Sequence, residues 1–233
     1  MKKFLFGAAV AAIALSAAPA SAVVLTNGSS GLAPTPFAGI AGSQGTLLAY
    51  QTITGSAITF SAEFRQAVYK NANGTLDFYY QVLRTGAGTG GNEEVDGFTV
   101  ASFKGFSVDG YASGPDIDGA GPFAAVNNGF LADGVTASGS TTTFGRSNSG
   151  DVVRVNFGLN GLSGTENSAT YVFRTNATAF TTGTFGVIDG STLAGVTFAP
   201  TVPEPATWAM MLGGFGLLGG AVRRSRRQTT VLA

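Results

Sequence analysis

Residues 57–82 read AITFSAEFRQAVYKNANGTLDFYYQV, and this stretch decides the fold. Two runs rich in aromatic and β-branched residues flank the tetrapeptide Asn-Ala-Asn-Gly at positions 71–74. An Asn-Gly pair between two such runs is a strong signal for a β-hairpin. Because side chains of a strand alternate between its faces, the second run places four large side chains on one face. The four that we predict to be buried are Leu76, Phe78, Tyr80 and Val82.

Short runs of the same kind recur along residues 37–199. The clearest is 151–159, where alternation predicts a strand with one wet face and one buried face formed by Val153, Val155, Phe157 and Leu159. Further strands are predicted at Thr46–Thr52, Ala57–Lys70, Phe98–Phe103, Thr141–Gly145, Ala169–Thr175, Phe185–Ile188 and Leu193–Phe198. The spacing of strands and turns predicts an all-β domain over residues 37–199, an antiparallel β-sandwich or a jelly-roll-like fold.

The segments between these runs are rich in Gly, Ser and Thr. We expect exposed loops at 85–92, 110–121 and 137–143, and a flexible leader at 23–36. Glycine accounts for 35 of the 233 residues, about twice its usual share of about 7%. This composition favours a fold with many turns.

The chain contains neither cysteine nor histidine. The first absence excludes disulfides, thiolate nucleophiles and zinc or iron–sulfur sites built on sulfur. The second excludes a Ser-His-Asp triad, an HExxH zinc site and an imidazole that acts as acid, base or pH switch. We therefore expect no enzyme activity and no cofactor.

The N-terminus has the three parts of a secretory signal peptide. Lys2 and Lys3 precede an apolar run, and the small residues Ala20 and Ala22 bracket a cleavage site. We expect residues 1–22 to be removed after Ala22; the alternative is a retained membrane anchor.

A second topogenic segment lies near the C-terminus. Residues 206–222 are apolar or small throughout, and a helix of that length spans about 25 Å, near the lower limit for a bilayer core. A basic cluster follows directly, formed by Arg223, Arg224, Arg226 and Arg227. Since positive residues stay on the cytoplasmic side, we expect a transmembrane helix at 206–222 with the preceding domain outside.

Just before this helix stand Pro203, Glu204 and Pro205, followed by Trp208. Together with the apolar span and the arginines, this tail resembles the PEP-CTERM sorting signal of Gram-negative bacteria, which we place at residues 200–233. One departure is the segment 228–233, because the arginines usually end the chain. The two prolines hold the motif extended, as a processing enzyme requires.

The resemblance implies processing by an exosortase, a membrane-embedded transpeptidase-like enzyme. It also implies anchorage in the inner membrane with the domain in the periplasm, followed by transfer to the cell surface or the extracellular matrix. Proteins with this signal are associated with exopolysaccharide and biofilm, so these are the partners that the resemblance suggests.

Acidic loops are the candidate metal sites, because hard cations prefer carboxylate and carbonyl oxygens. The first contains Asp109, Asp116 and Asp118, and a weaker one contains Glu93, Glu94 and Asp96. Neither has EF-hand spacing, and Asp is an ordinary turn residue, so plain loops are the favoured interpretation. A GxGxxG pattern formed by Gly86, Gly88 and Gly91 has no predicted helix after it, so we read it as a hairpin loop rather than a nucleotide site.

Exposed tyrosines are candidate sugar-stacking residues. Tyr69 and Tyr79 fall on the outer face of the predicted hairpin, whereas Tyr80 is expected in the core. Glycoside hydrolysis would need a pair of carboxylates, and no motif selects one.

Charge is unevenly distributed along the chain. Residues 23–202 hold seven Lys and Arg against twelve Asp and Glu, and their basic residues are scattered. We therefore expect no nucleic-acid binding. The interpretation that we favour is an exported structural or adhesive matrix protein. The alternatives are a carbohydrate-binding module, with or without Ca²⁺, and, least favoured, an extracellular hydrolase that uses carboxylates.

Overall fold

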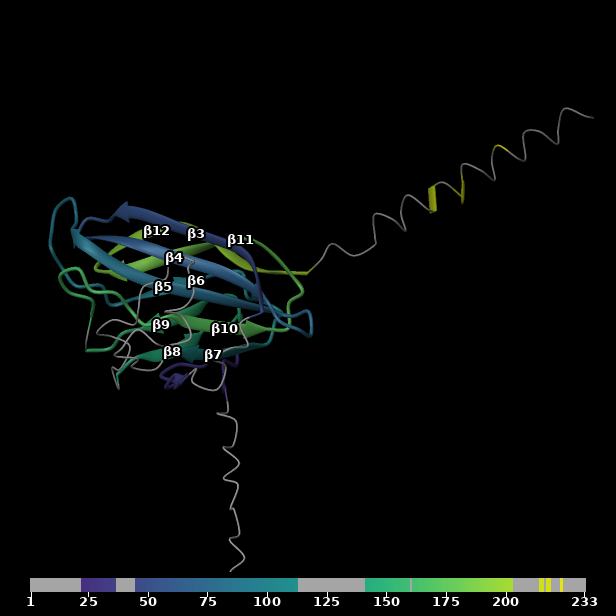
Figure 1. The fold of residues 1–233 in the computed structure, drawn as a ribbon, viewed down its shortest axis with the longest axis horizontal. Helices are drawn as coiled ribbons and strands as arrows, with labels where there is room; N and C mark the ends of the chain where they lie inside the picture. Colours follow the sequence, from purple (N-terminus) through teal and green to yellow (C-terminus); the bar gives the residue numbers. More distant parts are fainter. Residues whose placement is uncertain are drawn as a thin grey trace, which may run out of the picture.

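The computed structural model describes residues 22–36, 45–112, 141–159 and 161–202, together with 214–215, 217–218 and 223 near the C-terminus. Within these residues the chain forms two β-sheets whose inner faces share one hydrophobic core. This arrangement is a β-sandwich, as the sequence predicted (Figure 1).

The first sheet has the strand order β1-β7-β10-β5-β4-β3, and β2 pairs in parallel with β7. The long strands β3, β4 and β5 lie side by side in Figure 1. The bounds are β1 Val23–Val24, β2 Thr35–Pro36, β3 Thr46–Ser56, β4 Phe60–Lys70, β5 Leu76–Ala87, β7 Val108–Ala112 and β10 Tyr171–Thr175.

The second sheet is antiparallel throughout, with the order β12-β11-β6-β9-β8. Its bounds are β6 Gly97–Val100, β8 Thr143–Arg146, β9 Val153–Asn156, β11 Ala179–Asp189 and β12 Ser191–Thr201. The β11–β12 hairpin is paired along its whole length and turns at Gly190, whose φ of +51° suits glycine.

The predicted hairpin at 57–82 is confirmed. Strands β4 and β5 pair from Phe60 opposite Ala87 down to Lys70 opposite Leu76. Gly74 has a φ of +86°, which explains the Asn-Gly signal in this turn. The predicted face of β5 is fully buried, and so is most of its opposite face.

Aromatic rings join the two sheets across the core. Phe64 of β4 stacks on Phe185 of β11 with ring centroids 4.0 Å apart, and Phe98 of β6 meets Phe64 edge-on at 5.5 Å. Each such pair contributes about 0.5–1.5 kcal/mol beyond the burial of its area. The core is therefore held by rings from strands far apart in the sequence.

One polar side chain, Gln66, points into this core between the two sheets. It is fully buried, and its amide nitrogen donates to the carbonyl of Val196 at 3.1 Å. Its amide oxygen accepts the N–H of Phe198 at 2.6 Å and the hydroxyl of Thr197 at 2.7 Å. The Tyr80 hydroxyl beside it donates to the carbonyl of Phe198 at 2.6 Å. These bonds satisfy backbone groups at the edge of β12.

Residues 23–36, expected as a flexible leader, are instead part of the sandwich. β1 and β2 pair with β7, and Leu25 is 1% exposed within the core. The buried Arg146 guanidinium donates to the carbonyls of Leu25, Phe103, Phe106 and Gly150. Only tertiary pairing supplies these contacts, because the segment has neither a long apolar run nor regular alternation.

Two further predictions need correction. Leu159 was expected on the buried face of its strand but is 90% exposed, because β9 ends at Asn156 and Gly158 turns the chain with a φ of +71°. The segment 110–121 was expected to be an exposed loop, yet residues 110–112 belong to the buried strand β7.

Replacing Gln66 with Ala should lower the free energy of unfolding by about 2 kcal/mol, because three polar groups of β12 lose their buried partner. Urea denaturation of the otherwise unchanged chain measures this. Thr182→Ala is the control, since Thr182 is exposed on β11, makes no contact with Gln66 in the bonds above and should cost less than about 1 kcal/mol. Equal costs for the two variants would contradict the bridging role of Gln66.

Candidate functional site

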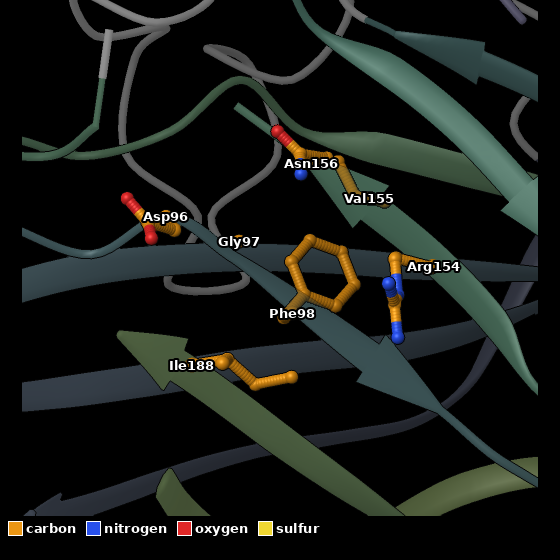
Figure 2. Close-up of a pocket in the computed structure, with 7 residues that line it drawn as sticks. All are labelled: Asp96, Gly97, Phe98, Arg154, Val155, Asn156 and Ile188. Atoms are coloured by element: carbon orange, nitrogen blue, oxygen red, sulfur yellow. The ribbon is translucent and has the colours of Figure 1, made fainter. Parts of the chain in front are cut away.

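A pocket of about 170 Å³ with mixed polar and apolar lining opens on the second sheet. Its lining residues are Asp96, Gly97, Phe98, Arg154, Val155, Asn156 and Ile188. Figure 2 shows them coming from three neighbouring strands, β6, β9 and β11. Arg154 and Asn156 alternate with core residues along β9 and are exposed, so their side chains project from the face turned away from the core.

Backbone hydrogen bonds and one glycine hold β6 close to β9 and β11 at the pocket. Asp96 immediately precedes β6; its N–H donates to the carbonyl of Ile188 and its carbonyl accepts the N–H of Phe157. A Cβ on the next residue, Gly97, would lie 2.2 Å from the carbonyl oxygen of Val155, so only glycine lets β6 approach β9 here. At Gly97 the backbones of β6 and β9 are therefore close together beside the pocket.

Asp96 is the acidic side chain of the pocket, and Asp189 places a second negative charge near it. Burial raises the pKa of Asp96, and the nearby charge of Asp189 raises it further. One carboxylate oxygen of Asp189 is buried and has no hydrogen-bond donor among the described residues. A guanidinium, a carboxyl group and an amide around a small pocket supply the donors and acceptors that bind hydroxyl-rich molecules.

Sequence reasoning did not single out this combination. Alternation placed Arg154 and Asn156 on the wet face of their strand, and Asp96 was named only as a weak cation ligand. They meet because β6 pairs with β9, and strand order across a sheet has no local signal in the sequence.

The tyrosines expected on the outer face of the hairpin are buried rather than exposed. Tyr69 is 4% and Tyr79 is 1% exposed, and their ring centroids lie 4.6 Å apart. They pack with Tyr111 and Val172 in a small second cluster, and burial raises the pKa of Tyr79. Stacking on sugars through these two rings is therefore wrong, whereas the core position of Tyr80 is confirmed.

The first acidic candidate is only partly described. Asp109 lies in β7, opposite Arg174 of β10, whereas Asp116 and Asp118 fall outside the described residues. Arg174 binds the buried Asp77 at 2.9 Å. Burial raises the pKa of Asp109, and the charge of Arg174 opposes that shift. Asp109 therefore belongs to a paired strand and lies beside the charged residue Arg174; it is not in an open loop.

The second acidic candidate does not converge either. Glu93 and Glu94 are exposed, and the described part of the chain holds no group of three side chains suited to a metal ion. The nearby GxGxxG pattern packs on the turn before β4, where Gly90 donates to the carbonyl of Ile58. No helix follows it before β6 begins, in agreement with the hairpin-loop interpretation.

The residues of the two terminal signals lie mostly outside the described part of the chain. These are Ala20, Pro203, Glu204, Pro205, Trp208, Arg224, Arg226 and Arg227. Ala22 begins the described chain, and Arg223 is helical and exposed. In the described residues, no helix has the length and apolar character needed to cross a membrane; most of the expected span 206–222 lies outside them.

The fold and tail together define an all-β sandwich followed directly by a C-terminal processing segment. Comparison with protein families identifies that segment as the PEP-CTERM protein-sorting motif, matched over residues 201–227. The chain therefore carries the mark of an exosortase substrate, and proteins with this motif are exported and sorted to the cell surface. The chain has no match among curated proteins and none among solved structures.

Replacing Asp96 with Asn should stabilise the fold at neutral pH. The native pKa of Asp96 is raised, so the native state holds its proton more tightly than the unfolded state does. Stability then falls as the pH rises from the unfolded pKa through the native one, and the gain from Asn should vanish below this window. Denaturation midpoints at neutral and acidic pH measure the effect.

The control for this prediction is the same substitution in a chain that already carries Asp189→Asn. The gain should be smaller there, because burial still raises the pKa of Asp96 but the added effect of the Asp189 charge is gone. An equal gain in both backgrounds would contradict repulsion between the two carboxylates.

Proposed function

We propose that this chain is a non-enzymatic matrix protein with a structural or adhesive role in exopolysaccharide or biofilm. The single observation that carries the proposal is the sorting motif, matched from residue 201 onward. The domain is held at the inner membrane on the periplasmic side and is then released to the cell surface or the extracellular polymer.

The junction between domain and motif supports this order of events. Strand β12 ends at Thr201, and Val202 is 66% exposed just before the Pro-Glu-Pro motif. Cleavage near Pro203–Pro205 leaves every described strand of the sandwich intact. The released domain keeps its mild negative charge, which opposes attraction to anionic lipids and nucleic acids.

Deleting residues 206–233 should abolish processing and surface delivery, because the deletion removes the membrane segment and the arginines. The full chain and the variant are followed by immunoblot mass and cell fractionation in a host with and without exosortase. Deleting only 228–233 is the matched control and should leave processing unchanged. If the intact chain keeps the same size and location without exosortase, the sorting proposal fails.

A second candidate function is carbohydrate binding, which the pocket at Asp96, Arg154 and Asn156 favours. These three side chains offer both donors and acceptors, and Ile188 offers an apolar wall. Sugar-binding sites combine such features. This function is compatible with a matrix role, because a polymer ligand would hold the domain in place.

The double variant Arg154→Ala/Asn156→Ala should weaken binding to polysaccharide at least about tenfold, since a charged hydrogen bond is worth about 1.5–3 kcal/mol. A glycan array with the full chain, with and without chelator, measures this and separates Ca²⁺-assisted binding from direct binding. Thr184→Ala, exposed on β11, is the control. No glycan bound by the unchanged chain, or equal binding by the double variant, contradicts the candidate.

A further inference from the structure

The lateral edges of the two sheets are not alike. A free edge presents unpaired N–H and C=O groups that pair readily with another strand, so proteins normally shorten, charge or cover it. At one end of the first sheet the strands β1 and β2 are only two residues long. Described residues bond part of each edge of the second sheet, and its edge strand β12 also contains Pro200.

The coverage of the second sheet is specific. On β12, Gln66 bonds the backbone of Val196 and Phe198, and Tyr80 bonds the carbonyl of Phe198. On β8, Leu32 exchanges two backbone hydrogen bonds with Phe144, at 2.7 and 3.1 Å. The backbone N–H of Arg146 donates to the carbonyl of Ser29 at 2.7 Å.

The remaining edge is β3, which has eleven residues and pairs on one side with β4. Among the described residues, no strand pairs with its other side. Its sequence, TLLAYQTITGS, contains no charged residue and no proline. Gln51, Thr52, Thr54 and Ser56 are exposed. One irregularity interrupts the pairing with β4 near Leu48, and the part from Ala49 to Ser56 is regular. This edge lacks the usual protection.

We propose that β3 pairs antiparallel with β3 of a second copy of this chain, about a two-fold axis at Ile53, so that the first sheet continues from one copy into the next. A two-fold contact is closed, because each copy uses the same edge. The pairing satisfies the open backbone groups of both copies at once.

The charges of the domain favour a second copy at this edge. The domain is acidic overall, which opposes contact between copies through acidic surfaces, whereas β3 itself is uncharged. In the register centred on Ile53, Thr52 faces Thr54 of the second copy, a favourable cross-strand pair. Thr54 pairs with Glu63 and Thr52 with Arg65 on β4. The two-fold axis therefore puts Glu63 of one copy in the same cross-strand row as Arg65 of the other.

Cysteine cross-linking tests this proposal directly, because the chain has no cysteine of its own. Paired Cα atoms across an antiparallel ladder lie about 4.5–5.5 Å apart, within the range of a disulfide. Single cysteines at positions 51–55 of the full exported chain should therefore give a sharp maximum of disulfide-linked dimer for Ile53→Cys. Thr52→Cys and Thr54→Cys should each fail alone and cross-link when the two chains are co-expressed.

Adding Thr52→Lys to Ile53→Cys should lower the dimer yield about tenfold, because an edge lysine blocks strand pairing. Thr184→Lys, exposed within the second sheet, should leave the yield unchanged, and protease resistance of each variant verifies folding.

A maximum at another β3 position overturns the register but keeps the pairing. No dimer at any position, equal dimer at all positions, or cross-links only to other proteins overturns the proposal. These outcomes are independent of exosortase processing.

Discussion

The buried amide of Gln66 is the interaction on which the arrangement of the two sheets depends. It lies in β4, in the core of the first sheet, yet its hydrogen bonds go to the edge backbone of β12 in the second. A buried polar group without partners is costly, so the two sheets align where this amide and the Tyr80 hydroxyl reach β12. Aromatic packing supplies most of the stabilisation, but rings alone tolerate shifts that hydrogen bonds do not.

This alignment also holds in place the strand that precedes the sorting motif. β12 is the last strand of the domain and leads directly into the motif matched from residue 201. The strand is anchored on one side by the β11 ladder and on the other by Gln66 and Tyr80. The last strand of the domain therefore has bonding partners on both sides immediately before the motif begins.

The edges of the two sheets and the pocket lie on different parts of the sandwich. The N-terminal segment, through Ser29 and Leu32, bonds to one edge of the second sheet, and the core glutamine bonds to the middle of the other. The pocket at Asp96 lies on the outer face of that sheet, where Gly97 allows β6 to approach β9. The β3 edge belongs to the first sheet. The contact that we propose between copies at β3 thus uses a different sheet from the ligand site that we propose at the pocket.

The sequence by itself determined the β-hairpin at 57–82, the burial of Phe78 and Tyr80, and the sorting motif, because alternation, turn chemistry and a linear motif are local properties. It did not reveal the packing of Leu25, the burial of Tyr69 and Tyr79 or the pocket at Asp96. Those depend on which strands become neighbours. Alternation alone predicts that the outer face of the hairpin is exposed. In the structure, Tyr111 and Val172 pack on this face because β7, β10 and β5 are neighbours in the sheet. Strand order is decided by non-local contacts across the sheet, and only the tertiary structure contains that information.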